Sequence, residues 1–138
     1  MQTIIKLFLL AVIFSTAILP ACKKYEEGPM ISFRTKKGRL ENTWKVEKWM
    51  LNGVEQNIAP YSGQTIQFTK EGNVTFAVGA FALTGTWKFI NDKEDVEITF
   101  TGSTAPDDTI HIIKLKNKEL WERETSGGIT EEFHYIPN

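Results

Sequence analysis

The side chains of this chain that could do chemistry are acidic residues, two histidines, several serines and one cysteine. Four glutamates, Glu122, Glu124, Glu131 and Glu132, gather near the C-terminus, and paired carboxylates can hydrolyse glycosides. An antiparallel pairing about Gly127-Gly128 places Glu124 opposite Glu131 beside an exposed turn, where water keeps carboxylates close to their ordinary acidity. The cluster therefore predicts no catalytic pair.

The histidines and the loop aspartates predict no metal site. His111 and His134 lie far apart in the sequence, with no Cys or His-x-Glu partner to complete a zinc shell. Asp107 and Asp108 could contact a cation, but calcium needs about six to eight oxygen ligands and the EF-hand spacing is absent. The serines lack the Gly-x-Ser-x-Gly elbow. We therefore predict no catalytic residue, no metal, no cofactor and a protein that is not an enzyme.

Cys22 is the only cysteine, so a disulfide within the chain is excluded. An uncharged apolar run at residues 7–19 precedes it, behind Lys6, which is typical of a secretory signal and shorter than the ~20 residues of a spanning helix. The sequence "LPAC" at 19–22 resembles the lipobox of bacterial lipoproteins, in which the cysteine is lipidated and becomes the new N-terminus. The resemblance implies a signal peptide over residues 1–21 and a lipid anchor, palmitate included, on Cys22.

The anchor predicts an exported protein held on the bacterial outer membrane. Each buried CH₂ contributes about 0.8 kcal/mol, so the acyl chains usual for such lipoproteins hold a protein effectively permanently. Glu26 and Glu27 follow Cys22 closely and resemble the short acidic signal with which lipoproteins of Bacteroidota reach the cell surface. Two orientations, facing the periplasm and exposed at the cell surface, both fit.

Composition predicts one small β domain after the signal. Removing residues 1–21 leaves 117 residues, and the formal net charge of −1 becomes −2 without Lys6, which leaves no basic surface for nucleic acid. Residues 22–38 mix charged residues with Gly and Pro and predict a lipidated N-terminus and tether. Residues 39–138 predict an antiparallel β domain, because they hold aromatic residues that suit a half-buried sheet. All four tryptophans lie there: Trp44, Trp49, Trp87 and Trp121.

The elements that must position these side chains are strands joined by short turns. Residues 43–51 change their alternation midway, which predicts a bulge near Glu47 and Lys48. A hairpin is predicted at residues 65–76 about "KEGN", followed by strands at 81–89 and 95–101 that flank "NDKE". No helical period is present outside the signal.

The remaining strands complete a meander. "IHIIKL" at 110–115 is apolar on both parities and predicts the most enclosed strand. The last hairpin, about Gly127-Gly128, pairs Leu120 with Tyr135 and Glu122 with Phe133 on one face, and Trp121 with His134 and Arg123 with Glu132 on the other. About eight strands in simple succession favour an all-β, antiparallel up-and-down barrel, since closure removes exposed edges.

Two short motifs, Asn42-Thr43-Trp44 and Gly85-Thr86-Trp87, add a resemblance to this prediction. Together with "IQFTKEGNVTF" and "KLKNKELWER", they make residues 39–136 resemble the lipocalin-like domains of small lipoproteins of Bacteroidota. The resemblance implies a lipocalin-like β-barrel over residues 39–138. It also implies that Trp44 and Arg123 stack as a cation–π pair that closes the barrel floor.

The interior of such a barrel is just wide enough for side chains or one small ligand. Large apolar residues that share the inward parity either form a cup for a small hydrophobic ligand or simply fill the barrel. The filled barrel would be a module that binds an envelope protein partner, which exposed aromatics such as Trp49 or Trp121 would support, or a purely structural lipoprotein. The inward residues are Phe68, Phe76, Leu83, Trp87, Phe89, Phe100 and Phe133.

Overall fold

The computed structural model describes residues 34–102, 104 and 107–138. The predicted signal peptide, Cys22 and most of the predicted tether lie outside the described residues. In the part of the chain that is described, no helix has both the length and the apolar character needed to cross a membrane. Every described element lies within 34–138, so residues 23–138 contain the whole described fold.

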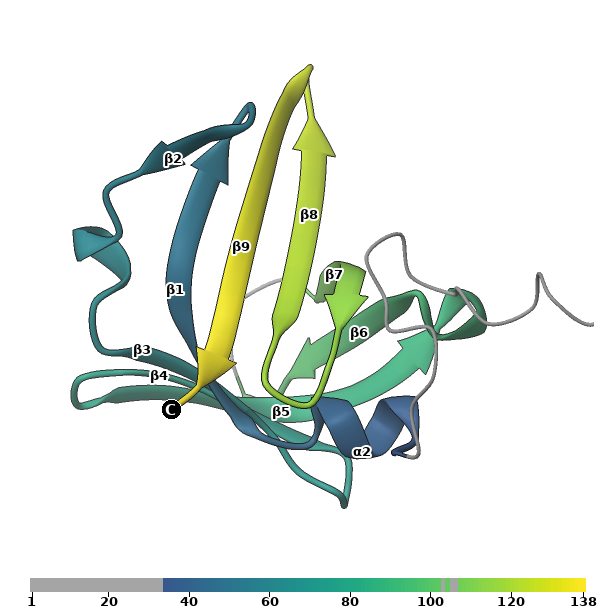
Figure 1. Cartoon of the computed structure of the whole chain (residues 1–138). Coiled ribbons are helices and arrows are strands. Elements are labelled where there is room, and N and C mark those ends of the chain that lie inside the picture. Colours follow the sequence, from purple (N-terminus) through teal and green to yellow (C-terminus); the bar gives the residue numbers. More distant parts are fainter. Residues whose placement is uncertain (1–33, 103, 105–106) are drawn as a thin grey trace, which may run out of the picture.

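The described chain folds into antiparallel strands with a short helix at one end (Figure 1). The helix is α2 (Lys36–Leu40), and the 3₁₀ turns are η1 (Ala59–Tyr61) and η2 (Asn91–Lys93). The strands are β1 (Thr43–Leu51), β2 (Val54–Gln56), β3 (Gln64–Phe68), β4 (Asn73–Val78), β5 (Phe81–Ile90), β6 (Asp95–Phe100), β7 (Asp108–Leu115), β8 (Leu120–Ser126) and β9 (Ile129–Pro137).

Eight of these strands close into a barrel. From β3 to β9 each strand pairs with the next, and β1 pairs with β3 on one side and with β9 on the other. The ladder between β1 and β3 covers only residues 43–45 of β1, and the short strand β2 takes the place of β3 beside residues 49–51. The predicted all-β, antiparallel up-and-down barrel is confirmed, with β2 as one strand more than the barrel needs.

The predicted bulge in β1 is present. Val46 pairs with Tyr135 and Lys48 with His134, so the register shifts at Glu47. The extra residue turns both halves of the strand to the same side, which allows Trp44 and Trp49 to share the inner face despite their opposite parity.

The predicted pairing of the last hairpin is confirmed. Leu120 pairs with Tyr135, Trp121 with His134, Glu122 with Phe133 and Arg123 with Glu132, about the turn that contains Gly127 and Gly128. The prediction that residues 110–115 form the most enclosed strand also holds, because every one of them is buried except His111.

Helix α2 closes one end of the barrel and was missed in the sequence, where residues 22–38 predicted a tether. Thr35 caps the helix by accepting a hydrogen bond from the backbone N–H of Gly38 at 3.0 Å. Leu40 is buried at its end, and its carbonyl accepts a 2.9 Å bond from Nε1 of the buried Trp44. A helix of five residues is too short to show a 3.6-residue period.

Strand β2 was also missed. Asn52 and Gly53, with φ of 48° and 78°, form the turn that folds it back onto β1. Positive φ at both central residues is the requirement of a type I′ hairpin turn, and Asn-Gly is its preferred sequence. The Asn52-Gly53 dipeptide was therefore the sequence feature from which this hairpin could have been predicted.

Candidate ligand pocket

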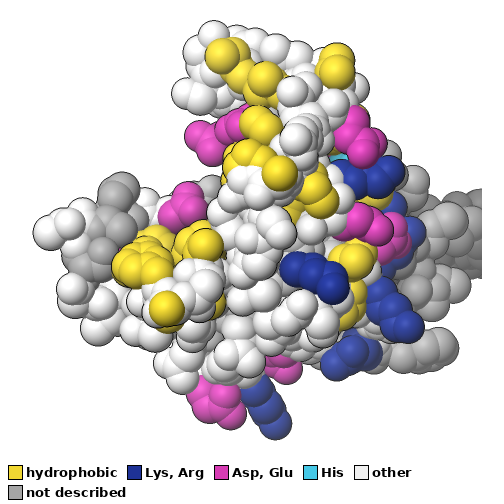
Figure 2. Space-filling model, turned by 90° about the vertical axis from the view of Figure 1, so that its left-hand side faces the viewer, with side chains coloured by type: hydrophobic (Ala, Val, Ile, Leu, Met, Phe, Trp, Pro, Cys, Tyr) yellow, Lys and Arg dark blue, Asp and Glu magenta, His cyan; other side chains and the backbone are white. Residues whose placement is uncertain are grey.

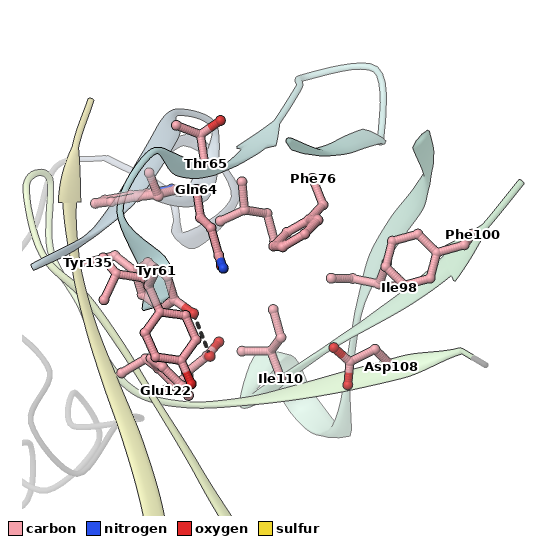
Figure 3. A pocket seen from close by; sticks show the side chains of 14 residues that line it. Tyr61, Gln64, Thr65, Phe76, Ile98, Phe100, Asp108, Ile110, Glu122 and Tyr135 are labelled. Carbon is pink, nitrogen blue, oxygen red and sulfur yellow. Dashed lines mark hydrogen bonds between the residues drawn. The ribbon is translucent and has the colours of Figure 1, made fainter. Parts of the chain in front are cut away.

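A cavity of about 270 Å³ lies inside the barrel, on the side away from helix α2. Its lining comes from β1, β3, β4, β6, β7, β8, β9 and η1 (Figure 3). The floor consists of Trp44 and Val46 of β1. Sites for small molecules usually measure about 300–1,000 Å³, so this cavity suits an occupant near the lower limit.

One wall of the pocket is apolar. Phe76, Ile98, Phe100 and Ile110 stand on it, from strands β4, β6 and β7 (Figure 3). Side chains of this kind offer dispersion contacts and no competing polar group, which is what a hydrophobic ligand needs. Together with Ile66 of β3, they make most of the pocket surface hydrocarbon.

Three of the seven residues predicted to form an apolar cup do line the pocket: Phe76, Phe100 and Phe133. Four do not. Phe68, Trp87 and Phe89 pack edge to face on one another, with ring centroids 5.6 Å apart in each pair, and belong to or border the core cluster outside the pocket. Leu83 pairs with Phe76 in the sheet but lies outside the lining. The predicted inward residues thus fall into two groups, because the barrel is filled at one end and hollow toward the other.

Tyr61 of η1 is a lining residue that the sequence analysis missed. Its ring contacts Trp49 and Phe133 edge to face, with centroids 5.3 and 5.0 Å apart, and so fills the gap where β1 leaves β3. Burial, and next the carboxylate of Glu131, raise the pKa of the Tyr61 hydroxyl. A tyrosine in a loop shows no periodicity, so only its position in the fold reveals this role.

A carboxyl group stands inside this mostly apolar pocket. The hydroxyl of Tyr135 donates a 2.6 Å hydrogen bond to Oε1 of Glu122 (Figure 3). Burial raises the pKa of Glu122 to about 7, the bond from Tyr135 acts in the opposite direction, and the charges of Asp108 and Glu124 raise it further. Burial and the same carboxyl raise the pKa of the Tyr135 hydroxyl, so it remains a donor. The predicted register of the last hairpin places Glu122 and Tyr135 on the same face as Leu120. That shared face was the feature of the sequence from which their contact could have been predicted.

Asp108 is the second acidic residue of the pocket. The sequence analysis considered Asp108 as a cation contact, whereas in the structure it begins β7 and its carboxyl borders the cavity across Ile110 from Glu122 (Figure 3). The lining contains no Lys, Arg or His among the residues that the structure describes, and Gln64 and Thr65 are its neutral polar members. The pocket is therefore apolar with an acidic end.

The pocket also has a side opening. Strands β7 and β8 pair between Ile112–Glu122 and Leu115–Leu120, and no pairing is recorded beyond Glu122. A smaller cavity of about 50 Å³ occupies this gap and shares Asp108 and Glu122 with the main pocket. The smaller cavity thus adjoins the main pocket at its two carboxyl groups.

The predicted cation–π pair between Trp44 and Arg123 is wrong. Trp44 faces inward opposite Pro137, whereas Arg123 pairs with Glu132, five residues away along β9 and on the outer face. At the usual rise this separation is roughly 17 Å. Arg123 instead forms an ion pair with Glu132, Nε to Oε2 at 3.2 Å. This end is sealed by Leu40 over Trp44, and Lys37 of α2 lies with its Nζ 5.7 Å from the ring centre of Trp87.

Neither tryptophan singled out as a docking aromatic is exposed. Trp49 packs inside the barrel, stacked on Phe133 at 6.3 Å. Trp121, on the outer face, lies between the ammonium group of Lys114, 3.6 Å from its ring centre, and the ring of His134, stacked at 3.8 Å. On the face that Figure 2 shows, hydrophobic side chains form separate groups among polar ones. The exposed large hydrophobic residues of the described chain are Val54, Ile58, Phe81 and Ile129.

The two histidines lie apart and outside the main pocket lining. His111 Nδ1 is 2.6 Å from Oδ1 of Asp95, and His134 Nε2 is 2.5 Å from Oε1 of Glu132. In the described ranges, no three His, Cys, Asp or Glu side chains come together as a metal site. Each histidine thus has a carboxylate partner and a structural position in the sheet.

Comparison with known proteins agrees with this architecture. Residues 40–120 match the family model described as the lipocalin-like domain. A lipocalin-like protein from Bacteroides uniformis superposes with a TM-score of 0.56 at 12% identity, over 73% of this chain and 100% of that one. A DUF4847 family protein from Bacteroides vulgatus gives a TM-score of 0.46 at 15% identity, over 72% and 94%. No curated protein matches the chain.

Proposed function

The chain belongs to the lipocalin-like domain family, and from this premise we propose that it is a binding protein that holds a small hydrophobic ligand in its barrel and does no catalysis. One observation carries the proposal: the barrel is filled with large side chains at one end and keeps a cavity of about 270 Å³ toward the other. A well-packed end gives the pocket a rigid floor, and rigidity lowers the entropy lost on binding.

The anchor is the second part of the proposal. We propose that the chain is exported, that Cys22 carries the acyl groups, and that the barrel stands on the bacterial outer membrane, facing either the periplasm or the cell surface. The support is the lipobox at residues 19–22 behind an apolar signal of secretory length. A binding barrel fixed to a membrane meets hydrophobic molecules where they concentrate.

The pocket is tested by titrating residues 23–138 with 1-octanol in a calorimeter, because octanol is small, uncharged and mostly apolar. We expect saturable one-to-one binding in the micromolar range. Val46→Trp places a large ring in the pocket lining and should weaken octanol binding at least tenfold. The expected loss corresponds to the roughly 1–3 kcal/mol that extra side-chain volume costs in a packed core. Thr86→Trp, on the exposed side of β5, is the matched control and should bind as the unmodified chain does.

If octanol gives no saturable binding curve, and the same sample still unfolds cooperatively, the proposal is contradicted. The barrel would then act as an interaction module for an envelope protein partner or as a structural lipoprotein. Equal binding by Val46→Trp and the unmodified chain would place the ligand elsewhere on the molecule, which also contradicts it.

A further inference from the structure

The polar groups of the pocket determine which hydrophobic ligands it can accept, and this inference rests on the proposed function. From the position of Glu122 and Asp108 at one end of an apolar cavity whose described lining residues include no Lys, Arg or His, we infer that the pocket takes a small apolar amine rather than a fatty acid. The ammonium group lies against the two carboxyl groups, and the hydrocarbon body lies against Phe76, Ile98 and Phe100.

Glu122 has room for a ligand donor. A carboxylate has about four acceptor positions, and the hydroxyl of Tyr135 uses one of them on Oε1. Tyr135 also holds the carboxyl in place, because its ring stands on β9 next to the pocket. An ammonium group brings three donors and a positive charge, so it complements a carboxylate better than a hydroxyl does.

The basic residues near this end do not serve an anionic ligand. Arg123 and His111 border the smaller cavity between β7 and β8, but Arg123 is paired with Glu132 at 3.2 Å and His111 with Asp95 at 2.6 Å. A fatty acid carboxylate in the pocket would meet Glu122 and Asp108 without a countercharge in the lining. Repulsion between the ligand carboxylate and these two carboxylates would disfavour the bound state.

The pKa of Glu122 agrees with a cationic ligand. Burial first, and then the charges of Asp108 and Glu124, raise its pKa to about 7. A bound ammonium group would reverse these influences, because an opposite charge nearby favours the ionised carboxyl. Binding of an amine should therefore lower the pKa of Glu122 and release protons near neutral pH.

The cavity also limits the size of the amine. A cavity of about 150 Å³ holds one benzene molecule, so one of 270 Å³ takes a body somewhat larger than a single ring. An alkyl chain of about eight carbons or a bicyclic ring meets this limit. The chain of a longer lipid would not fit in this volume and would have to extend out of the barrel.

The test compares three probes with the same alkyl chain: octylamine, 1-octanol and octanoate. Each is titrated into residues 23–138 by calorimetry at about pH 8, where alkylamines are still protonated and the pocket carboxyls are mostly ionised. We expect octylamine to bind at least tenfold more tightly than octanol, and octanoate to bind most weakly. Repeated at about pH 7, where part of Glu122 is still protonated, the amine titration should also release protons, which buffers of different ionisation enthalpy would reveal.

Two variants locate the amine. Glu122→Gln keeps the shape and the acceptor for Tyr135 but removes the charge, so the preference for octylamine over octanol should fall about tenfold while octanol affinity stays within about twofold. Glu47→Gln, an exposed carboxylate of β1 that lines neither cavity, is the matched control and should keep the preference.

The outcomes separate the two claims. Binding of octanol or octanoate as tight as that of octylamine would overturn the inference and leave the proposed pocket intact. An amine preference that survives in Glu122→Gln would also overturn it, since the charge would then act elsewhere. Failure of all three probes to bind a folded chain would contradict the proposed function itself.

Discussion

At the scale of single residues, the chemistry of this protein centres on one carboxyl group. Glu122 stands among hydrophobic side chains and keeps one firm partner, the hydroxyl of Tyr135. Burying an ionised carboxylate is costly, so the group resists ionisation until about pH 7. The carboxyl of Glu122, together with that of Asp108 at the rim, is the polar group that would orient a hydrophobic ligand.

The raised pKa of Glu122 makes stability depend on pH. The folded chain holds this proton up to about pH 7 and the unfolded chain only up to its ordinary value of 4.5, so the folded state binds more protons between these values. The free energy of unfolding therefore falls as pH rises through this window and levels off above it, by about 3 kcal/mol at most. Urea denaturation across the window measures it.

Replacing the carboxyl of Glu122 tests whether this residue causes the pH dependence of stability. Glu122→Gln has no proton to lose, so its stability should not fall through the window, and at about pH 8 it should exceed that of the unmodified chain by up to about 3 kcal/mol. Glu47→Gln should retain the slope, because it leaves Glu122 and the neighbouring charges of Asp108 and Glu124 unchanged. The same slope in both variants would show that another group titrates.

At the scale of elements, the middle of β5 carries a strict requirement. Gly85 pairs with Val74 on one side and Phe100 on the other. A Cβ atom added there would lie 2.2 Å from the backbone oxygen of Thr99 and 3.0 Å from Cα of Phe100. Glycine in a strand often marks such a close backbone approach or a barrel corner. This explains the glycine before Thr86 and Trp87 by packing alone.

Gly85→Ala should accordingly destabilise the barrel. Neither neighbour can rotate away, since both contacts are backbone atoms, so we expect a loss of at least about 2 kcal/mol in the free energy of unfolding. Thr86→Ala, on the exposed side of the same strand, should change stability by less than about 0.5 kcal/mol. Thermal or urea unfolding followed by tryptophan fluorescence measures both, and equal stabilities would refute the packing argument.

At the scale of the whole molecule, the barrel closes on itself and leaves its two ends with different roles. Helix α2 seals one end through Leu40 and Trp44, and the pocket lies toward the other. The chain enters the barrel at the sealed end, directly before α2. Under the proposed function, the tether from Cys22 therefore reaches the sealed end and leaves the pocket end for ligands.

The lipid anchor gives a prediction for the complete chain in its bacterial host. Metabolic labelling with an alkyne analogue of palmitate should tag the unmodified protein, and Cys22→Ala should abolish the tag because no other cysteine is present. Ser126→Ala, at the end of β8, should be labelled like the unmodified chain. Persistent labelling of Cys22→Ala would rule out the proposed attachment site.

Local patterns in the sequence were enough for most of the barrel. Alternation marked strands β3 to β6, a continuous apolar run marked β7, and in β1 the change of parity near Glu47 identified the bulge. The register of the last hairpin followed from Gly127 and Gly128, because a two-residue turn leaves one pairing. Helix α2 and strand β2 were missed, because elements of five and three residues contain too few repeats of their periods for a pattern to be recognised.

The sequence by itself determined which side chains face inward, because a strand alternates sides at every residue. Only the tertiary structure decided how deep each one lies along the barrel, and depth separates the residues that fill, such as Phe68 and Trp87, from those that line, such as Phe76. It also placed Tyr61 against Phe133 and Glu122 beside an apolar wall. These are contacts between elements far apart in the chain, and no local period encodes where the curvature of a closed sheet leaves space.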